Sequence, residues 1–348
     1  MDVAFDRQPM AQAMSAKMRT RDVIPRQAPW IDSNVATSAT AERMQPTWRE
    51  AVWIAFVVVA LLVLDVVEPW LYGVVVPAAA MAIAVAKGAI DPRPWLLRRT
   101  IDRADLVAVA ALYVAVVGLF RLAFGVFTTQ NTLGLFLSFG GALVLGVAGP
   151  VVYTVWIRRR PLRALGVGFH NLRTTVVLAL VFASVQFAIT LWGYGLPRPR
   201  DWVPLLVMAL TVGVFESIFF RGFVQERLEE SLGVGPAILG ASILYALYHV
   251  GYGMRADEML FLFGLGVVYA IAYRLTQNVF VLWPLLTPLG SFFAQLEAGE
   301  LAGELPWASI AGFVDVLGLM AFVIWLAHRL ERRRQREVLQ HDRTREVR

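Results

Sequence analysis

Residues 215–253 read FESIFFRGFVQERLEESLGVGPAILGASILYALYHVGYG, and their pattern indicates two helices joined by a turn. Two apolar arms flank a turn that contains Gly233, Gly235 and Pro236, residue types that interrupt helices and mark turns. The first arm begins at Trp202, is long for one membrane span and becomes amphipathic toward its end. We therefore expect a helical hairpin whose turn projects from the membrane into the cytoplasm.

The composition of the whole chain places this hairpin in a lipid bilayer. Of the 348 residues, 58% are hydrophobic and only 17% are charged, whereas globular proteins are usually ~45–50% apolar. Apolar runs separated by charged or Pro/Gly-containing breaks lie near 51–67, 69–87, 104–127, 132–157, 174–195, 202–230, 235–252, 259–276, 279–296 and 307–328. Since a span needs ~20 residues, we predict an all-α, polytopic transmembrane helix bundle of about ten spans.

The distribution of basic residues supports this topology. With the N-terminus inside, nearly all of the 32 Lys and Arg residues fall on the cytoplasmic side, and the outer loops hold only Arg198, Arg200 and Arg255. We expect a multi-pass protein of a bacterial cytoplasmic membrane with both termini cytoplasmic. The basic run from Arg329 is interpreted as an anchor to anionic lipid rather than a nucleic-acid arm.

The chain divides into five predicted regions. These are a disordered cytoplasmic tail at 1–48, a four-helix membrane region at 51–157, a core at 160–295, a final transmembrane helix at 307–328 and a basic cytoplasmic tail at 329–348. The first region has no apolar h-region and is therefore not interpreted as a signal peptide.

Charged or titratable side chains within the predicted spans are candidates for function, because a charge costs ~2.5–3.5 kcal/mol at a helix centre. These residues are Arg121, Glu216, Arg221, His249 and Asp315. Arg121 and Asp315 both fall near the outer face. An ion pair between them is expected there, with contact to substrate or lipid as the alternative.

Glu216 and His249 lie on the two arms of the hairpin. At ~1.5 Å per residue, each is about 25 Å from the turn at Gly233, so the two side chains are level. A carboxylate and an imidazole that meet can activate a water molecule. The alternative is a buried polar contact that only specifies helix packing.

Three segments together resemble the CAAX-protease and bacteriocin-processing family (CPBP, or Abi), which includes the type II CAAX prenyl endopeptidases. They are FESIFFRGFVQERL (215–228), SILYALYHVGYG (242–253) and FLFGLGVVYAIAYRLTQNVFVLWPLLTPLGS (261–291), and the resemblance covers roughly 160–295. The family pattern is a Glu-Glu-x-x-x-Arg helix, a Phe-x-x-x-His helix, and a further helix carrying a His with a polar residue four places later.

The resemblance implies an intramembrane glutamate-dependent peptidase. Glu216 matches the first glutamate of the family, the proposed general base that activates water. Arg221 matches the motif arginine, which orients its helix or pairs with a carboxylate, and His249 matches the histidine of the second motif. Tyr245 stands where the family usually has Phe.

Two departures from the family pattern bear on activity. Ser217 replaces the second glutamate, so Arg221 lacks the carboxylate four residues before it. The third motif has no histidine, and 279–296 offers only Thr287 and Ser291, beside prolines that favour a polar pocket. Both can hydrogen-bond a water or an oxyanion, more weakly than a charged imidazole would. Catalysis is thus weakened, altered or lost in this interpretation.

Other peptidase chemistries lack their residues in this sequence. It contains no cysteine, no His-Glu-x-x-His, no Gly-x-Ser-x-Gly and no membrane aspartate pair of the Gly-x-Gly-Asp kind. One of the four histidines, His170, falls in a basic loop and is interpreted as interfacial. We expect neither a metal nor a cofactor.

The leading hypothesis is a glutamate-dependent endopeptidase that uses Glu216-activated water to cleave a membrane-associated protein or peptide. The alternative is a catalytically impaired, CPBP-like scaffold or chaperone that binds a partner segment. A transporter ranks third, because the prolines of 279–296 resemble a broken helix. The expected partners are a protein or peptide substrate and the lipid bilayer, with no nucleic acid; the oligomeric state stays open.

Overall fold

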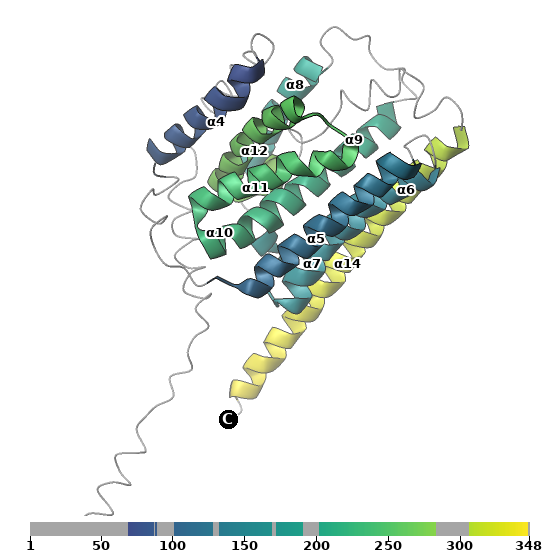
Figure 1. The fold of residues 1–348 in the computed structure, drawn as a ribbon. Coiled ribbons are helices and arrows are strands. Elements are labelled where there is room, and N and C mark those ends of the chain that lie inside the picture. The colour runs from purple at the N-terminus through teal and green to yellow at the C-terminus, as the bar shows by residue number, and fades with distance from the viewer. Residues whose placement is uncertain are drawn as a thin grey trace, which may run out of the picture. The chain divides into compact units, whose positions relative to one another are not determined.

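The computed structural model describes residues 69–86, 88, 101–127, 132–168, 172–190, 202–282 and 306–346. Within these ranges every regular element is a helix, so the predicted all-α fold is confirmed there (Figure 1). The predicted tail at 1–48, the predicted span at 51–67, and His170, Thr287 and Ser291 lie outside the described residues.

The helices of the first part of the chain are α4 (Pro69–Ala86), α5 (Arg103–Leu122), η2 (Ala123–Phe127), α6 (Thr132–Gly140), η3 (Gly141–Ala148), α7 (Gly149–Val151), η4 (Val152–Ile157), η5 (Leu162–Leu165) and α8 (Leu172–Thr190). Those of the second part are α9 (Trp202–Glu216), η7 (Ser217–Gln225), α10 (Glu226–Leu232), α11 (Val234–Tyr248), η8 (His249–Tyr252), α12 (Ala256–Thr276), η9 (Val279–Val281) and α14 (Pro306–Glu346).

Four helical stretches in the described residues are long and apolar enough to cross a membrane. They are Arg103–Phe127, Phe136–Ile157, Val234–Tyr252 and Glu258–Thr276. Exposed apolar side chains on α5, such as Val107 and Val114, are suited to contact lipid tails. The protein therefore has the features of an integral membrane protein, and the count of about ten spans stays a prediction.

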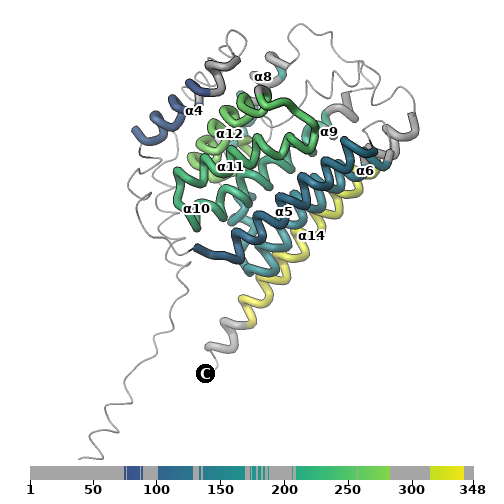
Figure 2. The backbone as a smooth tube through the Cα atoms, viewed as in Figure 1, coloured from purple at the N-terminus to yellow at the C-terminus, as the bar shows by residue number. Residues whose placement is uncertain are grey.

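The predicted hairpin is present in the structure. Helices α9, η7 and α10 follow one another without a break and end at Leu232. Gly233 then adopts φ 96°, a conformation that glycine reaches at little cost, and α11 starts at the next residue. Both η7 and α10 pack against α11, so the two arms lie side by side (Figure 2).

The hairpin is embedded in an aromatic core. Phe215, Phe219, Phe220 and Phe223 on α9 and η7 are completely buried. A Cβ atom on Gly146 of η3 would lie 2.2 Å from the ring of Phe215. Close approach at small residues is typical of helix packing in membranes, and here it fixes the position of the helix that carries Glu216.

Helix α14 extends through the predicted final span and the predicted basic tail as one continuous helix. It packs against α6, beside which it runs in Figure 1, and against η3, η4 and α9. In its basic part, the guanidinium of Arg333 lies over the ring of Trp156 at 4.7 Å, and that of Arg329 lies over the ring of Trp325 at 5.1 Å. Arginine over exposed tryptophan is suited to the boundary between lipid and water.

The expected ion pair between Arg121 and Asp315 is not formed. The side chain of Arg121 is exposed, and the buried Oδ2 atom of Asp315 has no hydrogen-bond partner in the part of the chain that the structure describes. Arg121 and Asp315 therefore do not stabilise each other.

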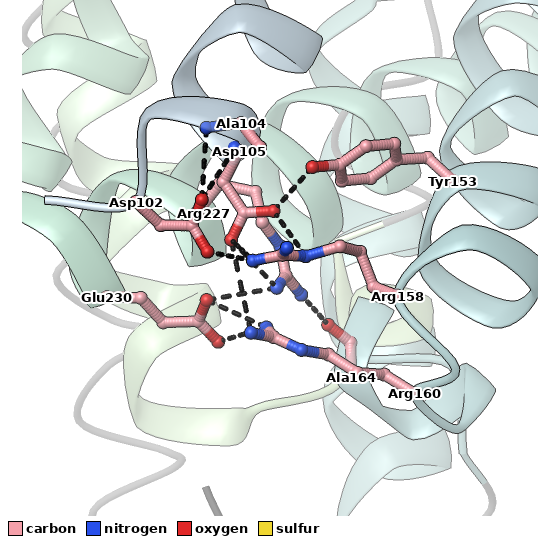
Figure 3. Close-up of polar contacts among 9 residues, drawn as sticks. All are labelled: Asp102, Ala104, Asp105, Tyr153, Arg158, Arg160, Ala164, Arg227 and Glu230. Atoms are coloured by element: carbon pink, nitrogen blue, oxygen red, sulfur yellow. Dashed lines mark hydrogen bonds and ion pairs between the residues drawn. The ribbon is translucent and has the colours of Figure 1, made fainter. Parts of the chain in front are cut away.

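A charged cluster ties the end of the hairpin to neighbouring helices (Figure 3). Its side chains are those of Asp102, Asp105, Tyr153, Arg158, Arg160, Arg227 and Glu230. Asp105 and Arg227 are each only 1% exposed. Asp105 accepts a hydrogen bond from the Tyr153 hydroxyl at 2.7 Å, and Arg227 lies 2.9 Å from a carboxylate oxygen of Glu230. Because its arginines and carboxylates balance, we interpret this cluster as a structural clamp on α5, α10 and the segment after η4.

Candidate active site

Glu216 is the acidic group at the centre of the candidate site. It ends α9, its side chain is 5% exposed, and its carboxylate accepts a hydrogen bond from the hydroxyl of Tyr248 on α11. The ring of Tyr248 packs against Phe120, Phe215 and Phe220. The carboxylate thus accepts from the Tyr248 hydroxyl inside an aromatic shell, and the Tyr245 hydroxyl also interacts with it.

The π-helical geometry of η7 determines where Arg221 points. In an α-helix, residues five apart lie roughly 140° apart around the axis, so Glu216 and Arg221 would face different sides. A π-helix closes its hydrogen bonds from i to i+5, and its wider turn brings residues five apart toward one face. The structure has this wider turn from Ser217, and the charges of Glu216 and Arg221 are close enough to interact.

Arg221 is a buried charge that forms no hydrogen bond with the described residues. Its side chain is fully buried, and its guanidinium lies over the ring of Tyr245 at 5.2 Å. None of its three guanidinium nitrogens has a hydrogen-bond partner among the described residues. Since burying an unpaired charge is costly, such an arginine is a candidate for function.

His249 lies beside Tyr245 and Tyr248 and has a defined tautomer. Its Nδ1 atom is 3.0 Å from the carbonyl oxygen of Tyr245, and a carbonyl oxygen can only accept. Nδ1 therefore carries the hydrogen, and Nε2 keeps a lone pair that can accept a proton. The imidazole is 7% exposed, and its ring centroid lies 4.0 Å from that of Tyr248.

Ser217 does not replace the missing second glutamate. Its hydroxyl donates to the carbonyl oxygen of Gly213 at 2.7 Å, within its own helix. Tyr245 instead contributes its ring to Arg221 and its carbonyl to His249. The sequence-predicted residues Glu216, Arg221, His249 and Tyr245 are thus brought together around the hairpin.

Sequence reasoning missed Tyr248, which makes the direct contact to Glu216. A signal for it exists, because Tyr245, Tyr248, His249 and Tyr252 occupy positions i, i+3, i+4 and i+7. In a helix this spacing places all four side chains on one face. Tyrosine is also common in apolar cores, so this spacing by itself does not distinguish a functional face of the helix from a core-facing one.

The described residues contain no group of three or more His, Asp or Glu side chains that could hold a metal ion. The chemistry available at this site is that of a carboxylate, an imidazole, an arginine and phenol hydroxyls.

Fold and site together define a helical membrane protein with a carboxylate and an imidazole buried in one helical hairpin. Residues 198–285 match the family model described as type II CAAX prenyl endopeptidase Rce1-like. The matched segment contains Glu216, Arg221 and His249, and the match supports the resemblance of these motifs to the CAAX-protease (CPBP) family. No curated protein and no solved structure matches the chain.

Proposed function

We propose that this protein is an intramembrane endopeptidase in which Glu216 activates a water molecule to cleave a membrane-associated protein or peptide. The observation that carries the proposal is the buried Glu216 carboxylate, which accepts a hydrogen bond from Tyr248, the tyrosine whose ring lies against His249, within a segment that matches a CAAX endopeptidase family. A buried carboxylate in lipid is expensive, and general-base chemistry provides a reason to retain it.

The proposed reaction begins with the transfer of a proton from water to Glu216. The oxygen of that water then forms a bond to the scissile carbonyl carbon, which gives a tetrahedral oxyanion. Collapse of this intermediate breaks the C–N bond, and the proton held by Glu216 passes to the leaving amine. His249 presents Nε2 to the same region and orients the water as an acceptor, while the positive charge of Arg221 offsets the negative charge that develops.

Cleavage by the purified protein in lipid nanodiscs tests this proposal. The substrate is a library of membrane-associated peptides, and the products are identified by mass spectrometry. We expect Glu216→Gln and His249→Ala each to lower the rate by about 10²–10⁴-fold, the range typical of general acid–base catalysis. The control is Glu337→Gln on the exposed end of α14. Undiminished cleavage by both site variants would overturn the proposal.

A second candidate function is a non-catalytic scaffold that holds a partner segment. Two observations favour it: the hydroxyl of Ser217 faces its own helix, and Arg221 lacks hydrogen bonds within the described residues. This candidate predicts that Glu216→Gln leaves partner capture unchanged and that no peptide is cleaved. Hydrolysis that depends on Glu216 would eliminate it.

A further inference from the structure

Tyr248 has an environment that differs from that of an ordinary core tyrosine. Its side chain is 1% exposed, and its ring is enclosed by Phe120, Phe215 and Phe220, so its orientation is fixed. Its hydroxyl reaches across the hairpin from α11 and donates to Oε1 of Glu216. Buried phenol hydroxyls need a partner, and here that partner is the carboxylate at the centre of the site.

The contact determines which oxygen of Glu216 is available. Oε1 accepts the hydrogen bond of Tyr248, so Oε2 is the oxygen that would take the proton from water in the proposed reaction. A hydrogen bond to a charged acceptor is short and directional, so it fixes the carboxylate plane as well as favouring the ionised form. A general base needs both effects.

The neighbouring residues do not supply this hydrogen bond. The hydroxyl of Ser217 donates to Gly213, and Nδ1 of His249 donates to the carbonyl oxygen of Tyr245. Arg221 forms no hydrogen bond within the described residues. Tyr248 is therefore the residue whose hydroxyl contacts Oε1 of Glu216 across the hairpin, beside a weaker interaction of Glu216 with the Tyr245 hydroxyl.

We propose that Tyr248 is a positioning residue for Glu216, a role that rests on the endopeptidase function proposed above. Its hydroxyl keeps its own proton throughout the reaction and holds Oε1 while Oε2 receives the proton of water. Its ring, which lies against the imidazole of His249, keeps the base and the imidazole in a fixed relation. In this chain a tyrosine thus orders a carboxylate that has no second glutamate beside it.

Tyr248→Phe tests the proposal because it removes one oxygen atom and keeps the ring contacts. We expect kcat to fall about tenfold with little change in KM, since the hydrogen bond orients the base rather than the substrate. We also expect the acid limb of the pH–rate profile to move to higher pH by about one unit, because the ionised carboxylate has lost a donor. A purely structural role would lower the amount of folded protein without moving this limb.

Tyr113→Phe is the matched control. The Tyr113 hydroxyl also donates a hydrogen bond between helices, to the carbonyl oxygen of Leu244 at 3.0 Å, and its ring contacts Phe220 at 6.5 Å between centroids. It does not contact Glu216. We expect this variant to keep the wild-type pH–rate profile even where it unfolds at a lower temperature.

An infrared titration separates failure of this inference from failure of the proposed function. The carbonyl band that Glu216→Gln removes reports protonation of Glu216 whether or not the protein cleaves peptides. In Tyr248→Phe we expect this band to titrate at higher pH, and in Tyr113→Phe we expect it to be unchanged. A band unaffected by Tyr248→Phe overturns the inference. If the band shifts but the protein cleaves no peptide, the hydrogen bond between Tyr248 and Glu216 is confirmed. The endopeptidase proposal is then wrong, and the catalytic role of Tyr248 is wrong with it.

Discussion

Gly222 lies directly against the carbonyl oxygen of Leu165, and a Cβ atom at this glycine would be 2.2 Å from that oxygen. Gly222 follows Arg221 on the helix of the candidate site, and Leu165 ends η5. The contact is with backbone, which cannot rotate away as a flexible side chain could. Glycine at this position therefore permits the site helix and the preceding segment to touch.

Gly222→Ala should separate these two elements. We expect a loss of at least about 1–3 kcal/mol of stability, the usual cost of overpacking, and a fall in any Glu216-dependent activity. Thermal unfolding in detergent measures the first effect. Gly118→Ala on α5 is the control, because nothing lies within 4 Å of its Cβ position and alanine favours a helix. Equal unfolding temperatures for the two variants would contradict the packing argument.

The charged clamp gives a second prediction, centred on Asp105. Asp105→Ala removes the carboxylate that lies against Arg158 and within 3.8 Å of the buried Arg227. We expect a loss of about 3–5 kcal/mol, because arginine charges remain buried without this partner. Removing the exposed pair of Arg333 and Glu337 with Glu337→Gln should cost less than about 1 kcal/mol.

The double variant Asp105→Ala/Arg227→Met checks the cause of that loss. It removes a buried charge of each sign and should recover part of the stability, since the uncompensated guanidinium is gone. Additive losses in the double variant would show that the two side chains do not depend on each other.

The hairpin could be predicted from the sequence because its determinants are local. Gly233 marks a break between two apolar arms, and the helices end and begin on either side of it. The continuation of α14 also has a local cause, since no Gly or Pro interrupts the chain between His328 and Glu346. Both features follow from residue types at neighbouring positions.

The contacts of the site could not be predicted in the same way. The π-helical turn after Glu216 has no signal in the residue types, and its wider turn brings residues five apart, such as Glu216 and Arg221, toward one face. The hydrogen bond from Tyr248 joins residues 32 positions apart, and no local pattern specifies which tyrosine of the face reaches the carboxylate. The pairing of Asp105 with Arg227 is likewise a product of the fold.

Acid should lower the stability of the charged cluster, because it protonates the carboxylate of Asp102. Partial burial opposes ionisation of this carboxyl, but its hydrogen bonds with Arg158 and with the backbone of α5 prevail and hold the pKa of Asp102 below its ordinary value. A lowered pKa means that the native state stabilises the carboxylate. This contribution is complete above about pH 4 and disappears as the pH falls through the native pKa.

Asp102→Asn makes this contribution measurable. The wild type should unfold at a higher temperature than the variant at pH 7, and the difference should disappear as the pH falls through the lowered native pKa of Asp102. Because the Asp102 side chain is 40% exposed, the difference should stay within about 1 kcal/mol. If the unfolding temperatures of the wild type and the variant differ by the same amount at every pH, the charge of Asp102 does not cause the difference.

Arg221→Met separates function from stability at the site. The guanidinium is buried without hydrogen bonds within the described residues, so an apolar side chain of similar length should be tolerated or should raise the unfolding temperature. Activity should nevertheless be lost, since the charge that offsets the developing oxyanion is gone. The comparison is Arg227→Met, which removes a hydrogen-bonded guanidinium and should unfold at a lower temperature. A large destabilisation by Arg221→Met would indicate a structural role.

Ser217→Glu restores the second glutamate of the family pattern and discriminates the two candidate functions. The new carboxylate stands four residues before Arg221 and can supply the partner that this guanidinium lacks among the described residues. If the protein is a weakened peptidase, we expect cleavage to rise several-fold, because Arg221 is then held in place beside Glu216. A scaffold should gain no hydrolysis. Ser217→Ala is the control for the lost hydroxyl, which bonds only within its own helix and should matter little. Since a glutamate is larger than the buried serine, the unfolding temperature is measured as well, and a folded Ser217→Glu protein that cleaves nothing counts for the scaffold.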